Sequence, residues 1–452
     1  MRSLLLGGLA AITFWAPYAD GQNTAGDDVV SVFTEHPRLF LRPARLRLLQ
    51  KERERASARW QQFDAYLSAD APLPEPGFAE ALYYQVSGSV PAGRKAIAWA
   101  LGPEAPGAGR DLRQLALVFD WCQKLLTETE RRGLAARILQ GLEEAPPSES
   151  IPAMRARVLA AVALYDDVPD LPNRELQRAV RNWWEGKMAP SIARGQAPAR
   201  EDAYALWEIF HAIRDNTNLD LRESAPRFFK SFPVEHLMSN YPATYPGEDN
   251  DFHIDASTQT GLPNLTRATF SRAGELAMVA FDTNAEESQY LQGWLMHDRF
   301  ELRSSLGAPY EFLWANQYQP GLSFTLLPLV YHNPDTGTVF VRSDWDESAQ
   351  WFGYFDGAAQ IFRDGRVEPV KLAGAPPLLL PSAVIYFGAS RFRVKLDEDQ
   401  SAVIVVGLAP GKTYQVEVDD EEVLEQAADP GGVLVLDVPH GKETGVRLQV
   451  VP

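Results

Sequence analysis

The spacing of apolar residues changes along this chain near residue 331. Before that point, apolar residues mostly recur three and four positions apart, the period of a helix that buries one face. After it, they alternate with polar residues, the period of a strand with one buried face. Between Gly337 and Gly357 the pattern predicts a strand, an acidic turn and a second strand. The sequence therefore predicts a helical part followed by a β part.

Helical spacing predicts a succession of helices joined by short linkers rich in proline and glycine. The first helix begins at Pro43, because the first turn tolerates proline. Further helical patterns cover residues 78–84, 93–101, 111–126, 127–141, 151–165, 174–184, 202–215, 264–281 and 284–296. Antiparallel helices with short turns between them are typical of stacked hairpins, bundles and toroids.

The β part shows alternating segments separated by glycine, proline and aspartate. They cover residues 384–394, 403–406, 414–418, 433–438 and 446–450. Pro430-Gly431-Gly432 is a hairpin turn signal between two of them. The last ~120 residues therefore predict an antiparallel β-sandwich.

The length of the chain and its N-terminal sequence predict how the chain divides into domains. A chain of 452 residues is long enough for two domains. Arg2, an apolar run and small residues predict a secretory leader over residues 1–21, too short for a lasting membrane span. After the leader we expect an α/α-toroid domain over residues 22–330 and a β-sandwich domain over residues 331–452. We therefore expect a secreted or periplasmic protein without a membrane span after cleavage.

Charge and cysteine content exclude several classes of function. The net charge of −17 repels nucleic acid and anionic membranes, so we expect neither as a partner. The single cysteine, Cys122, excludes an intramolecular disulfide and a cysteine-rich metal site. Its place in an apolar helical pattern predicts a buried side chain. The oligomeric state cannot be read from these numbers.

The helix over residues 202–215 carries the densest group of candidate site residues. Leu206, Ile209, Phe210 and Ile213 share one face at helical spacing. The opposite face gathers Tyr204, Trp207, Glu208, His211 and Asp215. An acid, a base and aromatic rings on one stripe can line a sugar groove. The alternative is a solvated face with a contact between His211 and Asp215.

A second candidate is the segment of residues 240–255. Asp251, His253 and Asp255 occupy alternate positions, so an extended backbone would place them on one face. They can bind a metal or sugar hydroxyls, or form a solvated acidic loop. Because the pattern matches no calcium loop, we expect no metal and no other cofactor. Tyr331 and His332 precede a turn at the junction of the two parts, where clefts often form.

Four segments resemble the heparinase II/III-like polysaccharide lyases. The sequence His-Pro-Arg-Leu-Phe-Leu-Arg-Pro-Ala-Arg-Leu at residues 36–46 resembles the start of that family's first helix. Residues 117–121 and 126–130 resemble its helix-and-turn segment, and residues 338–345 resemble the entry to its β domain. The resemblance implies an α+β multidomain fold, an incomplete (α/α) toroid followed by an antiparallel β-sandwich.

The resemblance also implies a chemistry, β-elimination at a uronic acid. A tyrosine or histidine removes the proton beside the sugar carboxylate, which an asparagine, histidine or arginine must neutralise. Relatives carry an Asn/His cluster at a toroid helix start and a tyrosine in a nearby loop. The corresponding helix start here, residues 199–203, has no adjacent Asn-His pair, whereas the loop contains Tyr241 and Tyr245.

Together these features define the expected site. Catalytic roles fall to Tyr241, Tyr245, His211 and His253, and substrate contacts to Tyr204, Trp207, Glu208, Arg214, Tyr331 and His332. We expect residues 241–255 to fold over the concave face that presents the helix stripe. The partner is a uronic-acid-containing polysaccharide, bound or cleaved. Two alternatives stay open: a non-catalytic glycan-binding or envelope-assembly relative, and a toroid glycoside hydrolase with Glu208 and Asp251 as opposed carboxylates.

Overall fold

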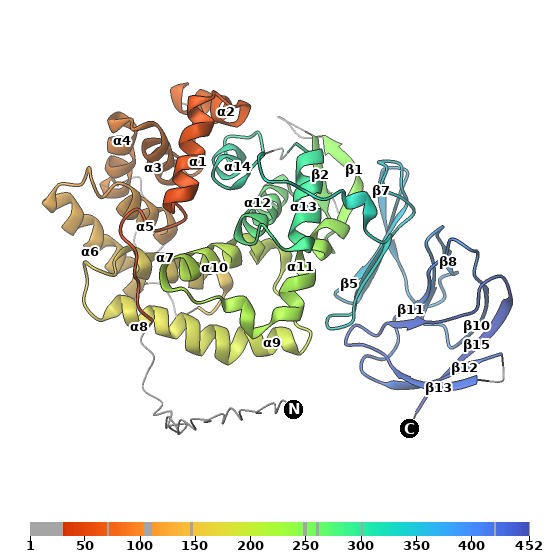
Figure 1. Cartoon of the computed structure of the whole chain (residues 1–452). Coiled ribbons are helices and arrows are strands. Elements are labelled where there is room, and N and C mark those ends of the chain that lie inside the picture. The colour runs from red at the N-terminus through yellow and green to blue at the C-terminus, as the bar shows by residue number, and fades with distance from the viewer. Residues whose placement is uncertain are drawn as a thin grey trace, which may run out of the picture.

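The computed structural model describes most of the chain beyond its first residues. The described ranges are residues 30–69, 72–103, 111–144, 148–246, 251–258, 262–299, 302–419 and 422–451. The expected leader, residues 1–21, lies outside them. In Figure 1 helices fill the first part of the chain and sheets fill the last part, as the sequence pattern predicts.

Helices occupy most of the chain up to Trp314. They are α1 (Pro43–Glu54), α2 (Ala58–Ser68), α3 (Pro76–Ser87), α4 (Val90–Leu101), α5 (Leu112–Trp121), α6 (Glu128–Glu144), α7 (Ile151–Ala163), α8 (Leu171–Gln177), the π-helix η1 (Arg178–Met188), α9 (Ala189–Ala193), the 3-10 turn η2 (Arg200–Asp202), α10 (Ala203–Thr217), the 3-10 turn η3 (Leu221–Ser224), α11 (Pro226–Met238), α12 (Leu265–Phe281), α13 (Glu286–His297) and α14 (Gly307–Trp314). A further 3-10 turn, η4 (Phe324–Leu326), precedes the strands.

The helices form two layers of a toroid. In the inner layer α3, α5, α7, α10, α12 and α14 contact one another in that order, and α14 also contacts α3. Nearly every residue of α5, α10 and α14 is buried, as expected for helices covered on all sides. α4 and α6 flank α3 and α5, and α11 and α13 flank α12, each burying one face only. This arrangement confirms the predicted fold class.

The segment expected to be a loop over residues 241–255 is instead a β-hairpin. β1 (Asn240–Pro246) pairs antiparallel with β2 (Asp251–Asp255), with an irregularity between Asn240 and Thr244. Pro242 and Pro246 do exclude a helix, but a two-stranded ribbon tolerates proline at positions that donate no ladder hydrogen bond. The helical part therefore contains a strand pair that the sequence pattern did not predict.

The β part stacks three sheets. The first has the order β3 (Val330–Asn333), β4 (Thr338–Arg342), β5 (Trp351–Phe355), β6 (Ala358–Arg363) and β7 (Arg366–Val370). The second has the order β14 (Leu434–Leu436), β11 (Ala402–Val406), β9 (Ala383–Phe387) and β8 (Leu378–Leu379). The third has the order β10 (Arg391–Lys395), β15 (Glu443–Val450), β12 (Thr413–Val418) and β13 (Glu422–Ala427).

The middle sheet explains the one departure from antiparallel pairing among the named strands. β9 and β11 pair in parallel, and every residue of both strands is buried. One face of this sheet packs on the first sheet through Ile385 and Ile404, and the other packs on the third through Val384 and Val403. A sheet covered on both faces suits parallel strands with continuous apolar sequences. The sequence pattern at residues 384–394 merged β9 and β10, which a turn separates.

The first sheet also belongs to the helical core. Phe340, Trp351 and Phe362 pack in the same apolar cluster as the inner helices. The indole N–H of Trp351 donates to the carbonyl of Met238, at the end of α11, over 2.9 Å. The two parts therefore meet through a continuous packed interface. Within the described residues, no helix combines the length and apolar character needed to cross a bilayer.

Candidate functional site

A cavity of about 420 Å³ lies where the helical part meets the first sheet. Three segments far apart in the sequence converge on it: the helix start at residues 199–203, the residues that flank the hairpin, and the start of the β part. Its lining residues are Ala197, Pro198, Ala199, Arg200, Glu201, Phe232, Glu235, His236, Ser239, Ala256, Ser257, Thr258, Arg267, Thr338, Phe340, Phe355 and Asp356. We call this space the junction cavity.

The last turns of α11 supply Glu235 and His236 to the junction cavity. Phe228, Phe229 and Phe232 anchor the apolar face of this helix in the core. Asp356, which also lines the cavity, stands in the turn between β5 and β6 with a φ of 51°. Aspartate followed by Gly357 suits such a turn, because both residues tolerate positive φ. A rigid helix and a tight hairpin therefore each contribute a carboxyl group to the lining of one cavity.

Glu235 is the most perturbed carboxyl group in the cavity. Tyr331 donates its hydroxyl proton, and Asn333 its amide proton, to Oε2 of Glu235, each over 2.9 Å. Oε1 has no hydrogen-bond partner among the described residues. Burial raises the pKa of Glu235, and the charge of Asp356 adds to the rise against the opposing hydrogen bonds. Glu235 therefore holds a proton more readily than an ordinary glutamate.

His236 lies beside Glu235 and is 2% exposed. Burial, helped by the charge of Arg200, lowers its pKa well below the ordinary value, so the imidazole is neutral near pH 7. Its Nδ1 is 3.9 Å from a carboxylate oxygen of Glu275 and makes no hydrogen bond among the described residues. The ring packs edge-on against Phe232. His236 is thus an uncharged base at the wall of the cavity.

Two arginines, Arg200 and Arg267, also line the junction cavity, but most of their N–H groups already bind other residues of the protein. Arg200 donates to Glu275 over 2.7 Å and to Ser271 over 2.8 Å, and its Nε lies 3.1 Å from Asp255. Arg267 binds the same carboxylate of Asp255 over 2.6 Å. The side chains of Asp255 and Glu275 are each 1% exposed, so both arginines neutralise buried charges.

The sign of the charge in the cavity follows from these pairings. Once Asp255 and Glu275 offset the two arginines, the carboxylates of Glu201 and Asp356, and that of Glu235 when it is ionised, are left without a matching cation among the lining residues. Glu201 lies 3.6 Å from Arg267, which already serves Asp255. An anionic sugar would meet net negative charge there.

The structure places the predicted tyrosines outside the cavity walls. Tyr241 is 9% exposed, stacks on Phe362, and donates its hydroxyl proton to Gln360 over 2.9 Å. Burial raises the pKa of Tyr241 to about 12, which disfavours the tyrosinate that its expected role requires. Tyr245 is half-buried in β1, whose backbone pairs Tyr245 with Phe252 in the hairpin register. No described contact joins either tyrosine to His211.

His253 is held by structural contacts. Its Nδ1 lies 2.6 Å from Asp298, and its Nε2 lies 3.3 Å from the carbonyl of Pro242. The ring also packs edge-on against Trp294. Both nitrogens are therefore engaged with the protein. Asp251 lies at the start of β2, and its side chain is outside what the structure describes.

The stripe expected on residues 204–215 is buried rather than exposed to solvent. Tyr204, Trp207, Glu208 and His211 are at most 1% exposed, because the neighbouring inner helices cover this face of α10 as well. Glu208 binds Arg113, Tyr204 and Arg155. The prediction of an exposed polar face on this helix is therefore wrong.

His211 and Arg214 make contacts with α12 rather than with the junction cavity. Nε2 of His211 lies 2.9 Å from the carbonyl of Ala277, and burial lowers the pKa of His211 to about 4. Arg214 donates to the carbonyl of Phe281 over 2.6 Å and lies over its ring. The hydroxyl of Tyr331 binds Glu235, as described above. His332 pairs with Asp429 over 2.7 Å, connecting the first sheet to the turn before β14.

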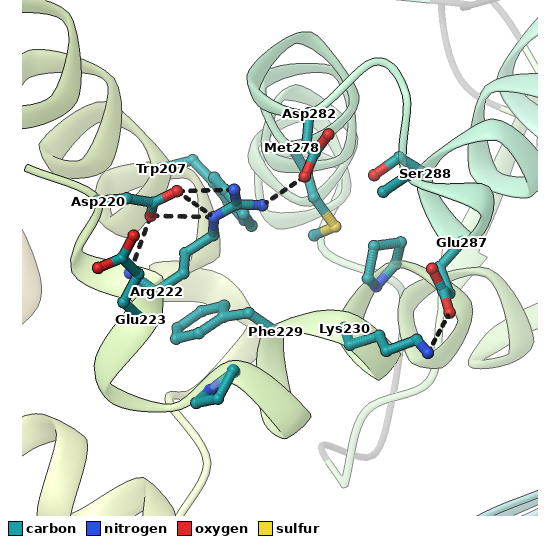
Figure 2. Close-up of a pocket in the computed structure, with 13 residues that line it drawn as sticks. Trp207, Asp220, Arg222, Glu223, Phe229, Lys230, Met278, Asp282, Glu287 and Ser288 are labelled. Carbon is teal, nitrogen blue, oxygen red and sulfur yellow. Dashed lines mark hydrogen bonds and ion pairs between the residues drawn. The ribbon is translucent and has the colours of Figure 1, made fainter. Parts of the chain in front are cut away.

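A second cavity, of about 340 Å³, opens between α10, α11, α12 and α13, and is drawn in Figure 2. Trp207, Phe229 and Met278 form apolar parts of its wall. Figure 2 shows Arg222 held between Asp220 and Asp282, and Lys230 paired with Glu287. These ion pairs occupy most of the charged groups in the wall, and Glu223 is an exposed carboxyl group at the same cavity.

Sequence reasoning missed Glu235, His236 and Asp356. Asp356-Gly357 was visible as a turn signal, but nothing in the sequence placed that turn opposite α11. Glu235 and His236 stood in a segment without a recognised helical pattern. Only the packing of the first sheet against the helices brings them together. No group of three or more potential ligands arranged for a metal ion occurs within the described residues.

Comparison with known proteins assigns this chain to no family. No protein-family model and no curated protein matches the chain. One solved structure, titled "Glycoside hydrolase", aligns with 83% of this chain and 71% of its own at 11% identity, with a TM-score of 0.32. A similarity that low supports no argument about fold or function. The proposals below therefore rest on the geometry of this chain.

Proposed function

We propose that this protein cleaves a glycosidic bond by hydrolysis in the junction cavity. The carrying observation is the pair Glu235 and Asp356, two carboxyl groups in the walls of one cavity. Burial and the charge of Asp356 raise the pKa of Glu235, whereas Asp356 is exposed to water. Carboxyl groups whose surroundings differ in this way can divide the roles of acid and base.

In this scheme Glu235 is the general acid. Its Oε2 is held by Tyr331 and Asn333, so Oε1 is the oxygen that carries the proton to the leaving sugar oxygen as the bond to the anomeric carbon breaks. Asp356 accepts a proton from the attacking water, whose oxygen bonds to that carbon. One product gains the proton and the other gains the hydroxyl group, which balances the reaction.

The apolar part of the wall suits a sugar ring. Phe232, Phe340 and Phe355 line the same cavity, and Phe355 is half-exposed. Aromatic faces pack against the C–H faces of sugars, while polar groups such as Ser257 and Thr258 can bind hydroxyls. A volume of about 420 Å³ accommodates a short stretch of glycan. The net negative wall favours a neutral glycan over a uronate polymer.

The test is an activity screen on neutral and uronate-containing polysaccharides. We expect new reducing ends without the ultraviolet absorbance of unsaturated products, which only elimination generates. Glu235→Gln and Asp356→Asn should each lower kcat by 100-fold or more, since general acid–base catalysis contributes about 10²–10⁴-fold. Asp364→Asn is the matched control, because Asp364 has the same φ of 51° in the next hairpin turn. Equal activity in all three variants would contradict the proposal.

β-Elimination is the second candidate, and His236 favours it. A neutral imidazole beside Arg200 combines a base with a cation, the two elements that the reaction needs. In that case ultraviolet-absorbing products appear from a uronate polymer, and His236→Gln abolishes them. If binding occurs without either product, the protein is a non-catalytic glycan-binding relative.

We also propose export of the chain after removal of residues 1–21. The support is the sequence pattern of a leader, namely Arg2, an apolar run and small residues before Gln22. The test is N-terminal sequencing of protein recovered outside the cytoplasm. A mature chain that still begins at Met1 would refute this plan.

A further inference from the structure

A third cavity, of about 600 Å³, lies at the opposite end of α10 from η2. It is formed by the start of α1, the ends of α10 and α12, and the segment that follows α14. Among the described residues that line it are four arginines, Arg42, Arg45, Arg47 and Arg214, and one carboxylate, Asp215. The charge balance here is opposite to that of the chain, whose net charge is −17. We call this space the arginine cavity.

Asp215 accounts for only part of that positive charge. Its Oδ1 accepts from Arg42 over 3.2 Å and from Arg214 over 3.4 Å. Burial would raise the pKa of Asp215, but His211, Arg214 and Arg45 hold it at about 2, so the carboxylate is ionised. Because burial keeps His211 neutral, one negative charge faces several guanidinium groups.

Arg45 is the least satisfied of these groups. Its guanidinium lies over the ring of Trp314, 4.3 Å from the ring centre, and its Nη1 is buried without a hydrogen-bond partner among the described residues. Burial lowers the pKa of Arg45 to about 10, so it is still charged near pH 7. A buried guanidinium N–H without an acceptor is costly to the fold.

Gln319, which also lines the arginine cavity, is a second residue with an unsatisfied hydrogen-bond donor. It is 7% exposed, and its Nε2 has no hydrogen-bond partner among the described residues. The backbone of Gln319 is nevertheless held in place, because Gln292 donates a hydrogen bond to its backbone oxygen over 3.1 Å. Arg45 from α1 and Gln319 from the segment after α14 therefore line one cavity, and each carries an unsatisfied nitrogen. What both lack is an acceptor.

We propose that the arginine cavity binds a small ligand through an oxyanion group, namely a carboxylate, sulfate or phosphate. Such a group has only acceptors and matches the fork of a guanidinium. It would satisfy Arg45 and Gln319 together and offset the excess charge beside Asp215. This site is separate from the junction cavity and does not depend on the function proposed there.

The experiment is calorimetric titration at low ionic strength with inorganic phosphate, sulfate and glucuronate, with glucose as the neutral comparison. We expect at least one anion to bind and glucose not to bind, with affinity falling as salt is added. The preferred anion identifies the source of the oxyanion group. Absence of heat with all three anions would refute the proposal.

Variants make the test specific to these donors. Arg45→Met should weaken anion binding about tenfold or more, since a hydrogen bond to a charged group contributes strongly, and Gln319→Leu should weaken it less. Arg363→Met is the matched control, because it removes the same charge from an exposed ion pair with Glu368. If Arg363→Met weakens binding as much as Arg45→Met does, the effect is general electrostatics and the site is refuted.

Thermal melting of the ligand-free protein separates binding from a structural role. Arg45→Met removes an unsatisfied buried donor and keeps an apolar chain over Trp314, so its melting temperature should equal or exceed that of the parent. The stabilisation that the anion confers on the parent should then be lost in this variant. A large drop in ligand-free stability would mean that Arg45 serves the fold, contrary to the proposal.

Discussion

Glu208 allows a quantitative test of the packed toroid. Its side chain is 0% exposed and accepts three donors: Arg113 at 2.8–3.0 Å, Tyr204 at 2.6 Å and Arg155 at 3.1 Å. Glu208→Gln keeps the shape of the side chain but removes its charge. Arg113, whose side chain is 3% exposed, would then have only Glu75 at 3.0 Å as a carboxylate partner.

The expected cost follows from that burial. Removing one partner of a buried ion pair leaves the other charge under-compensated and costs up to about 3–5 kcal/mol. At roughly 2 °C per kcal/mol for a large folding unit, the melting temperature should fall by up to about 6–10 °C. Burial would raise the pKa of Glu208, but Arg113 and Arg155 hold it below its ordinary value. The folded state thus favours the carboxylate, and its stabilisation, full above the ordinary pKa, disappears as the pH falls through the lowered one.

The assay is urea unfolding of the parent and of Glu208→Gln at several pH values, followed by circular dichroism. The difference in unfolding free energy should be constant near neutrality and shrink below about pH 4, the ordinary range of glutamate. Glu368→Gln, in the exposed pair with Arg363, should change stability by less than about 1 kcal/mol. A Glu208→Gln variant as stable as that control would show that Arg113 does not depend on this carboxylate.

Two further predictions concern the core. The pKa of His211 is lowered to about 4, so the unfolded chain takes up the proton at a higher pH than the folded protein does. The free energy of unfolding should therefore fall by about 3 kcal/mol between pH 6.5 and pH 4. Urea titrations of His211→Gln should show a smaller fall, and an identical fall would contradict this assignment. A Cβ on Gly353 would lie 2.1 Å from the Trp351 ring, so Gly353→Ala should lower the free energy of unfolding by about 1–3 kcal/mol, measured by thermal unfolding. Gly133→Ala is the control and should not destabilise the protein, because Gly133 stands in an uncrowded helix position.

The sequence predicted well those features that depend on local periodicity. The strand pair on either side of the acidic turn appears as β4 and β5, paired antiparallel in the register Phe340 to Gly353. The helix expected over residues 202–215 appears as α10, two residues longer at its end. Both results depend on neighbours within one element, which hydrophobic spacing encodes directly.

The site was harder to predict because it depends on contacts between distant segments. A polar stripe such as Tyr204, Glu208 and His211 has the same spacing whether it faces water or a partner helix. Here Arg113, 95 residues from Glu208 in the chain, makes the stripe part of the interior. The same reason hid Glu235 and Asp356, which become neighbours only when the first sheet packs on α11. Periodicity gives the direction of a side chain, but not what lies opposite it.

The aromatic interface of Phe340, Trp351 and Phe362 with the helical core has a kinetic consequence. Two of the walls of the junction cavity belong to α11 and to the first sheet, which this interface joins. Swinging them apart would expose three large buried rings, at about 25 cal/mol for each Å² of apolar surface. We therefore expect ligand association as a single step, without a slow opening or closing phase. Stopped-flow traces should fit one exponential whose rate rises linearly with ligand concentration.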